Sequence, residues 1–184
     1  MGDFLIGTKS VLTQSGSAEP VLASTLTGAP AISLDNATAP AWLVQASAMS
    51  NLATGADAVL DYDTVIQNVG GGTFNTTLGT NSYTAPVSGL YQINVSAHYE
   101  GFPNNVTDFR IKIVTSNRTY ERWYGKFINA EHSTNWAGTF DFSQLVDLDA
   151  SDTCVIKVYQ NAGSAAADLT AAHSYFSGFL VSKY

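Results

Sequence analysis

The sequence predicts an all-β protein, a sandwich of short strands preceded by an extended amino-terminal arm. From Trp42 onward, alternating or apolar runs are separated by Gly, Asn, Asp and Pro, a pattern typical of strands and turns. No segment has a convincing helical period. With 184 residues, 45% of them hydrophobic, the chain can bury a core without disulfides or metals. We therefore expect an arm over residues 1–40 and a head over residues 41–184.

The arm is marked by three prolines at ten-residue spacing, Pro20, Pro30 and Pro40. Proline is tolerated at the first position of a strand, and each of these precedes a short β-capable run, at residues 21–22, 31–34 and 41–44. Residues 10–12 form one more such run, about ten residues before the first of these. The arm has few large apolar side chains, so we expect it to pack against a partner, its symmetry mates or its own head. A partly disordered, low-complexity arm is the alternative.

In the head, ten runs are predicted to be strands: 42–47, 59–67, 73–75, 82–87, 90–99, 109–114, 120–128, 136–146, 153–159 and 175–183. Two of them alternate clearly. In 90–99 the odd residues are apolar, and in 136–146 the apolar face carries Trp136, Phe140, Phe142 and Val146. The opposite faces are small and mostly uncharged, which suits close approach of another subunit: Gln92, Asn94, Ser96, His98, Ala137, Thr139, Asp141 and Ser143.

Charge and composition exclude several classes of function. The chain has 15 acidic and 8 basic residues, a net charge of −7, which argues against binding to nucleic acid. No apolar run approaches the roughly 20 residues that cross a bilayer, and the first residues do not form a signal peptide, so we expect neither membrane insertion nor conventional secretion. The single cysteine, Cys154, shares a strand face with Ile156 and Val158, which indicates a buried, inert thiol.

Four stretches of the head carry a family resemblance: residues 62–68 (YDTVIQN), 72–75 (GTFN), 83–91 (YTAPVSGLY) and 175–180 (YFSGFL). In order and spacing they resemble the globular head of complement C1q, a ten-stranded jelly roll shared with the tumour necrosis factor superfamily. The resemblance covers residues 41–184 and implies a compact homotrimer. One sheet, including the first and last strands of the head, would face the threefold axis, with the small polar residues of 90–99 and 136–146 near that axis. Gly178 would let a neighbour pack closely on the last strand.

The chain also departs from that family. Its members usually follow a collagen-like stalk, and no Gly-X-Y period exists here. The arm instead resembles the low-complexity arms of tailed-phage virion proteins. We therefore expect a non-enzymatic, trimeric virion appendage, a fibre or decoration at the virion surface, bound to a capsid or tail protein through residues 1–40. A non-viral trimeric adhesin or ligand-binding protein at a cell or spore surface is the alternative.

The sequence holds no catalytic motif, and no cofactor is required. The family resemblance implies calcium bound near the trimer apex by loop carboxylates, for which the candidates are Asp141, Asp147, Asp149 and Asp152. The last three are also explained as turn-forming residues and solvated edge charges. In a trimer, the three copies of His98 are candidates to place three imidazoles at the threefold axis. A hydrogen-bonded structural histidine is the alternative.

A basic stretch predicts a binding surface on the outside of the head. Arg110 and Lys112 alternate with apolar residues and are expected to point outward, and Lys157 and Tyr159 share an exposed face of a later strand. We expect one wall that binds host surface saccharide, anionic or neutral, formed by Arg110, Lys112, Tyr120, Arg122, Tyr124 and Lys126. A solvated sheet face with balanced charges is the alternative.

Overall fold

The computed structural model describes residues 4–6, 9–13, 21–22, 39–102, 106–124, 136–161 and 167–184. The chain divides into two compact units, residues 1–36 and 37–184. In the first unit, β1 (Phe4–Ile6), β2 (Lys9–Thr13) and β3 (Val21–Leu22) form an antiparallel sheet. The strands expected at 10–12 and 21–22 are confirmed. The run at 31–34 lies outside the described residues.

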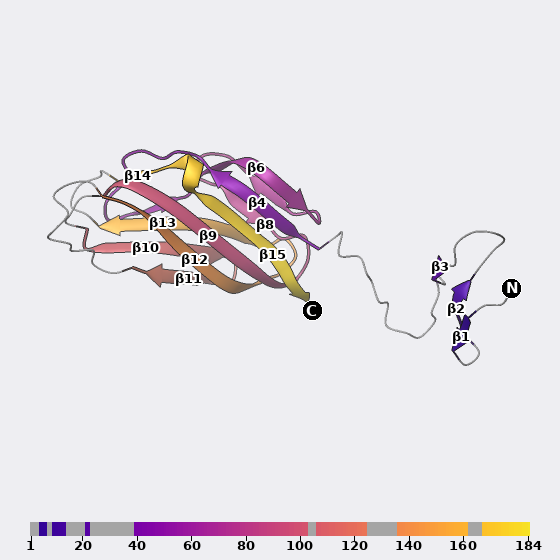
Figure 1. Cartoon of the computed structure of the whole chain (residues 1–184). Helices are drawn as coiled ribbons and strands as arrows, with labels where there is room; N and C mark the ends of the chain where they lie inside the picture. The colour runs from indigo at the N-terminus through magenta and orange to yellow at the C-terminus, as the bar shows by residue number, and fades with distance from the viewer. Residues whose placement is uncertain are drawn as a thin grey trace. The chain divides into compact units, whose positions relative to one another are not determined.

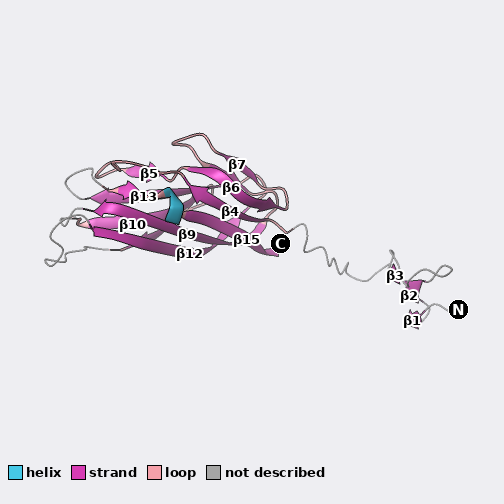
Figure 2. Ribbon diagram, turned by 45° about the horizontal axis from the view of Figure 1, so that its top comes forward, coloured by secondary structure: helices cyan, strands magenta, loops and turns pink. Residues whose placement is uncertain are grey.

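The second unit consists of two antiparallel sheets (Figure 1). The β9 sheet has the order β12-β9-β15-β4-β6, with β14 added beside β9. Its strands are β4 (Ala41–Ala46), β6 (Tyr62–Val69), β9 (Gly89–Phe102), β12 (Trp136–Leu148), β14 (Asp168–Leu169) and β15 (Tyr175–Lys183). A 3-10 helix, η2 (Ala171–His173), lies against β4 and β9 (Figure 2).

The β10 sheet has the order β11-β10-β13-β8-β7, with β5 paired to β13. Its strands are β5 (Asp57–Val59), β7 (Thr73–Asn75), β8 (Ser82–Thr84), β10 (Asp108–Thr115), β11 (Thr119–Trp123) and β13 (Thr153–Asn161). The all-β sandwich predicted from the sequence is confirmed.

The expected strand over 59–67 is wrong, because the chain crosses between the sheets there. β5 ends at Val59 in the β10 sheet, and β6 begins at Tyr62 in the β9 sheet. Between them, the buried Leu60 donates its N–H to the carbonyl of Ile156, and the carbonyl of Asp61 accepts from Ser47. One apolar run in the sequence thus supplies one strand to each sheet. The short β14 and η2 were not predicted.

Aromatic rings join the two sheets. Tyr99 and Phe102 of β9, Phe109 of β10 and Phe140 of β12 have ring centroids 4.4–6.1 Å apart. Such edge-to-face and tilted pairs add about 0.5–1.5 kcal/mol each beyond burial of their area. The odd residues of β9 from Tyr91 to Tyr99 are buried, as expected.

The thiol of Cys154 lies inside this core, so the prediction of a buried cysteine is confirmed. Burial raises the pKa of the Cys154 thiol to about 12. The reactive thiolate is therefore almost absent at neutral pH.

At the other end of the core, Trp42 of β4 stacks on Tyr83 of β8, with ring centroids 3.7 Å apart. The ring of Trp42 also lies over Gly178 of β15, as close packing on the last strand requires. A Cβ atom at residue 178 would come within 2.3 Å of the indole and 2.9 Å of the carbonyl oxygen of Gln92. The prediction that Gly178 permits a close neighbour is confirmed.

We expect Gly178→Ala to lower the free energy of unfolding by about 2–3 kcal/mol, because the added methyl group collides with a buried ring and with backbone. Gly79→Ala is the matched control: its φ is +78°, but no atom lies within 4 Å of the added carbon. It should cost only the backbone strain, about 1 kcal/mol. Denaturant unfolding at fixed protein concentration measures both, and equal losses would refute this account of the packing.

Candidate functional site

The polar face predicted on β9 and β12 exists as one surface. Antiparallel pairing sets Asn94 opposite Ser143 and His98 opposite Thr139. Ser143 Oγ donates to Asn94 Oδ1 at 2.7 Å, and Gln92 Nε2 donates to Ser143 Oγ at 2.8 Å. Seven of the eight residues expected to share this face do so, and all are half-buried or exposed: Gln92, Asn94, Ser96, His98, Thr139, Asp141 and Ser143. Ala137 is exposed but lies at a register irregularity of β12, where it has no partner on β9.

His98 is held by neighbours within its own chain. Its Nδ1 lies 2.8 Å from Thr139 Oγ1 and its Nε2 lies 3.8 Å from a carboxylate oxygen of Glu100. His98 is therefore hydrogen-bonded within its own chain, and its place at a threefold axis stays a prediction.

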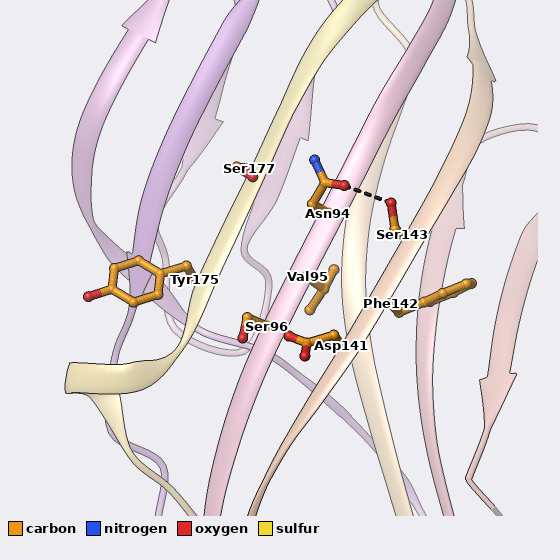
Figure 3. Close-up of a pocket in the computed structure, with 8 residues that line it drawn as sticks. All are labelled: Asn94, Val95, Ser96, Asp141, Phe142, Ser143, Tyr175 and Ser177. Carbon is orange, nitrogen blue, oxygen red and sulfur yellow. Dashed lines mark hydrogen bonds between the residues drawn. The ribbon is translucent and has the colours of Figure 1, made fainter.

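A shallow depression of about 200 Å³ lies in the middle of this face (Figure 3). Figure 3 shows its polar side chains on three adjacent strands, β12, β9 and β15. Its lining contains hydroxyl and amide groups and one carboxylate, and no basic side chain: Asn94, Val95, Ser96, Asp141, Phe142, Ser143, Tyr175 and Ser177. The surface therefore offers many hydrogen-bonding groups and little charge.

Next to the polar rows, the same face carries an apolar row that sequence reasoning missed. Strand pairing places one residue of each of the five strands β12, β9, β15, β4 and β6 in line: Leu145, Gln92, Phe179, Ala41 and Val69. Phe179 is 47% exposed and Leu145 is 46% exposed. Val181 and Leu90, also exposed, lie on β15 and β9 beyond this row. Four of the five residues in the row are apolar, and it spans the width of the sheet.

The four carboxylates considered for calcium do not form one site. Asp141 and Asp147 are six residues apart on β12, about 20 Å along a strand. Asp152 Oδ2 instead accepts from the backbone N–H of Asp149 at 2.9 Å and from Asn117 at 2.8 Å, and Asp147 accepts from the hydroxyl of Tyr184. Within the described residues, no group of three or more His, Cys, Asp and Glu side chains could hold a metal ion. These carboxylates do not converge within one protomer, and Asp149 and Asp152 act as turn-forming residues. Calcium binding at a trimer apex stays a prediction.

The basic wall does not form as predicted, because its described members lie on opposite faces of the β10 sheet. Directly paired residues of antiparallel strands share a face. Arg110 pairs with Trp123, whereas Arg122 pairs with the buried Ile111 and Tyr120 with the buried Ile113. Tyr120, Arg122 and Tyr124 are therefore on the core side of β11. Arg110 and Lys112 are on the outer side, and Lys126 lies outside the described residues.

Tyr124 packs as part of the core edge. Its ring centroid is 5.0 Å from that of Phe140 and 5.9 Å from that of Phe109. Its hydroxyl donates to the carbonyl oxygen of Asp141 on β12. Burial raises the pKa of Tyr124. This tyrosine therefore closes the gap between β11 and β12 and does not lie on the outer wall.

The outer face of the β10 sheet has a different composition from the one expected. One row across four strands reads Trp123, Arg110, Tyr159 and Asp57, and the next reads Glu121, Lys112, Lys157 and Val59. We call these eight residues the outer lattice. The guanidinium of Arg110 lies between two aromatic rings, 4.2 Å from the centroid of Trp123 and 4.9 Å from that of Tyr159. Trp123 was not among the predicted site residues.

Arg110 and Lys112 of the outer lattice also form ion pairs with carboxylates. Arg110 Nε donates to Asp108 at 2.9 Å, and Arg110 Nη1 donates to Glu121 at 3.1 Å. The hydrogen bond with Asp108 is the largest cause of the raised pKa of Arg110. Lys112 Nζ donates to Asp57 at 2.7 Å. With Lys157, three cations balance three carboxylates, so this face is locally neutral.

Two antiparallel sheets packed over a clustered aromatic core define an all-β sandwich domain. The sequence model of the C1q domain matches residues 41–181, and the chain belongs to the C1q domain family. This family consists of non-enzymatic interaction and recognition modules that typically form homotrimers and are extracellular or at surfaces. No curated protein matches the chain. Among the described residues, no helix is long and apolar enough to span a membrane.

We expect Tyr124→Ala to lower the free energy of unfolding by about 2 kcal/mol, because it removes a ring packed on the core. Arg122→Ala is the matched control, two residues earlier and on the same side of the sheet. Arg122 is exposed and its guanidinium lies 5.9 Å from the ring centroid of Tyr124, so its loss should cost less than about 1 kcal/mol. Chemical denaturation compares the two variants. A Tyr124→Ala protein as stable as Arg122→Ala would contradict the packing of Tyr124 on the core and support its place on the outer wall.

Proposed function

We propose that this chain is a homotrimeric recognition protein that associates through the outer face of the β9 sheet. The observation that carries this proposal is the row across five strands of that sheet, in which every residue but Gln92 is apolar. Side chains such as Phe179 and Leu145 are about half exposed in one protomer. Burying the remaining surface would contribute about 1 kcal/mol for each side chain. A cyclic trimer would bury three copies of the row in one closed interface.

The rest of the same face is compatible with close contact between protomers. Asn94, Ser96, Ser143 and Ser177 are short and uncharged, and the first and third of these already satisfy each other by a hydrogen bond. Short side chains bring little conformational entropy cost when they are ordered. This arrangement would leave the β10 sheet and its outer lattice directed away from the axis.

We further propose that the arm, residues 1–40, attaches the trimer to a larger particle, a capsid or tail, as part of a virion appendage. Two observations support a separate attachment segment: the amino-terminal unit has its own small sheet, and the chain has no collagen-like repeat. Display on a cell or spore surface is the alternative carrier.

Mass spectrometry of purified particles tests the choice of carrier. The virion proposal expects the chain in stoichiometric amounts in particles banded on a density gradient. Its absence from such particles, with recovery from the cell envelope fraction, would contradict the virion role and leave the trimeric recognition module in place.

We expect Phe179→Asp to convert the trimer into monomers at micromolar concentration, because three carboxylates would be buried without partners. Leu78→Asp is the matched control, since Leu78 is 70% exposed and lies in the loop before β8, away from the apolar row. Sedimentation velocity measures both variants beside the native chain. A native chain that sediments as a monomer of 19.5 kDa would contradict the proposal, as would a trimer unaffected by Phe179→Asp.

We expect a chain that begins at residue 37 to remain trimeric and to unfold as cooperatively as the whole chain, because the head forms its own compact unit. The same truncation should abolish attachment to the particle. Sedimentation and thermal unfolding test the first expectation, and co-purification with particles tests the second. Loss of cooperative unfolding would show that the arm completes the core of the head.

A further inference from the structure

The most exposed aromatic ring on the outer face of the β10 sheet belongs to Trp123, which is 60% exposed. It lies at the end of the row Trp123, Arg110, Tyr159 and Asp57. This ring does not pack in the core, because the pairing of Trp123 with Arg110 places it on the outer side of β11. Large exposed aromatic groups on a rigid sheet are typical of contact surfaces.

Trp123 is held in place by its neighbour. Arg110 stacks against its ring at 4.2 Å, and Arg110 is itself fixed by Asp108 and Glu121. The chain of contacts therefore runs from two carboxylates through one guanidinium to the indole. A ring that is already ordered loses little conformational entropy when a ligand stacks on it.

The charges around the ring decide which ligand fits. Asp108 and Glu121 neutralise Arg110, and Asp57 neutralises Lys112. Among the described residues of this face, Lys157 alone has no ion pair. A single half-buried lysine gives little attraction for a polyanion, and neighbouring carboxylates would repel one.

The remaining groups suit a molecule with apolar C–H faces and hydroxyl edges. The face of an aromatic ring is electronegative and attracts positively polarised C–H groups. Around Trp123 and Tyr159, the charged groups of Glu121, Lys112 and Asp57 are placed to exchange hydrogen bonds with hydroxyls, and such charge-assisted bonds are roughly twice as strong as neutral ones. A pyranose ring has both features, and a neutral one brings no charge to repel.

We propose that the outer lattice is a binding site for a neutral saccharide, which stacks on Trp123 and donates and accepts hydrogen bonds at Glu121 and Lys112. The proposal rests on the proposed function in one respect, that assembly leaves the β10 sheet facing outward. It narrows the saccharide expected from the sequence to the neutral class, and it moves the site from Tyr120, Arg122 and Tyr124 to the opposite face of β11.

The test uses the full-length protein on an array of immobilised neutral oligosaccharides built from glucose, galactose and N-acetylglucosamine, beside sialylated and sulfated ones. We expect binding to at least one neutral probe, changed less than about threefold between about 50 mM and about 500 mM NaCl, because screening acts on charge attraction and not on stacking. Trp123→Ala should weaken that binding about tenfold or more, the equivalent of one good stacking contact. Trp123→Tyr should restore most of it, and Leu78→Ala, which removes an exposed side chain elsewhere, should change nothing.

Several outcomes would overturn the proposal: no binding to any neutral probe, binding only to anionic probes and lost at high salt, or equal binding by Trp123→Ala and the native chain. Thermal unfolding of each variant shows that the fold is intact, and because Trp123 is exposed we expect no change. Sedimentation of the same samples keeps the two claims apart. A monomer that binds neutral saccharide through Trp123 would contradict the trimer and support the site, whereas a trimer that binds none would contradict the site alone.

Discussion

The register of β9 is the constraint on which the rest of the head depends. This strand is hydrogen-bonded on both sides, to β12 and β15, and successive side chains must point to opposite faces of the sheet. Its odd residues form the core with the rings of the β10 sheet, and its even residues form the polar surface. A slip by one residue would bury Asn94 and Ser96 and expose Ile93 and Val95, at a cost no other contact could offset. The core and the proposed assembly face are therefore two results of one alternation.

The β10 sheet follows the same rule and uses its outer face differently. Its inner residues, such as Ile111, Ile113 and Phe109, complete the aromatic core. Its outer residues combine aromatic, cationic and anionic groups, so that Arg110 stacks between two rings and pairs with Glu121. One sheet thus presents an apolar row and small polar groups, and the other presents a neutral lattice with an exposed indole. This contrast is the basis on which we propose association through one face and recognition through the other.

Much of this arrangement follows from the sequence alone. The alternation in residues 90–99 and 136–146 predicts both faces of β9 and β12, and Gly178 and Cys154 occupy the environments that their neighbours predict. The failures have a common physical origin, since they concern residues whose position depends on a partner strand. Along residues 120–124, one face would carry Tyr120, Arg122 and Tyr124 and the other Glu121 and Trp123. Both sets contain large amphipathic side chains, so hydrophobicity alone does not predict which set faces the core. The tight turn in which the N–H of Thr115 donates to the carbonyl of Arg118 determines which set faces the core. This turn fixes the register of β10 and β11, which sets Trp123 opposite Arg110. The apolar row was missed for a similar reason: its members lie far apart in the chain and meet only when five strands pair.

Hydroxyl-radical footprinting of the native, full-length protein, read residue by residue by mass spectrometry, tests the central claim most directly. In one protomer Phe179 is 47% exposed and Trp123 is 60% exposed, so both should be oxidised if the protomer is free in solution. Our account predicts strong oxidation of Trp123 together with protection of Phe179, Leu145 and Tyr175, and reactivity of these three on dilution below the dissociation concentration of the trimer. Oxidation of Phe179 at the rate that its exposure in the single protomer predicts, at micromolar concentration, would contradict association through the β9 sheet.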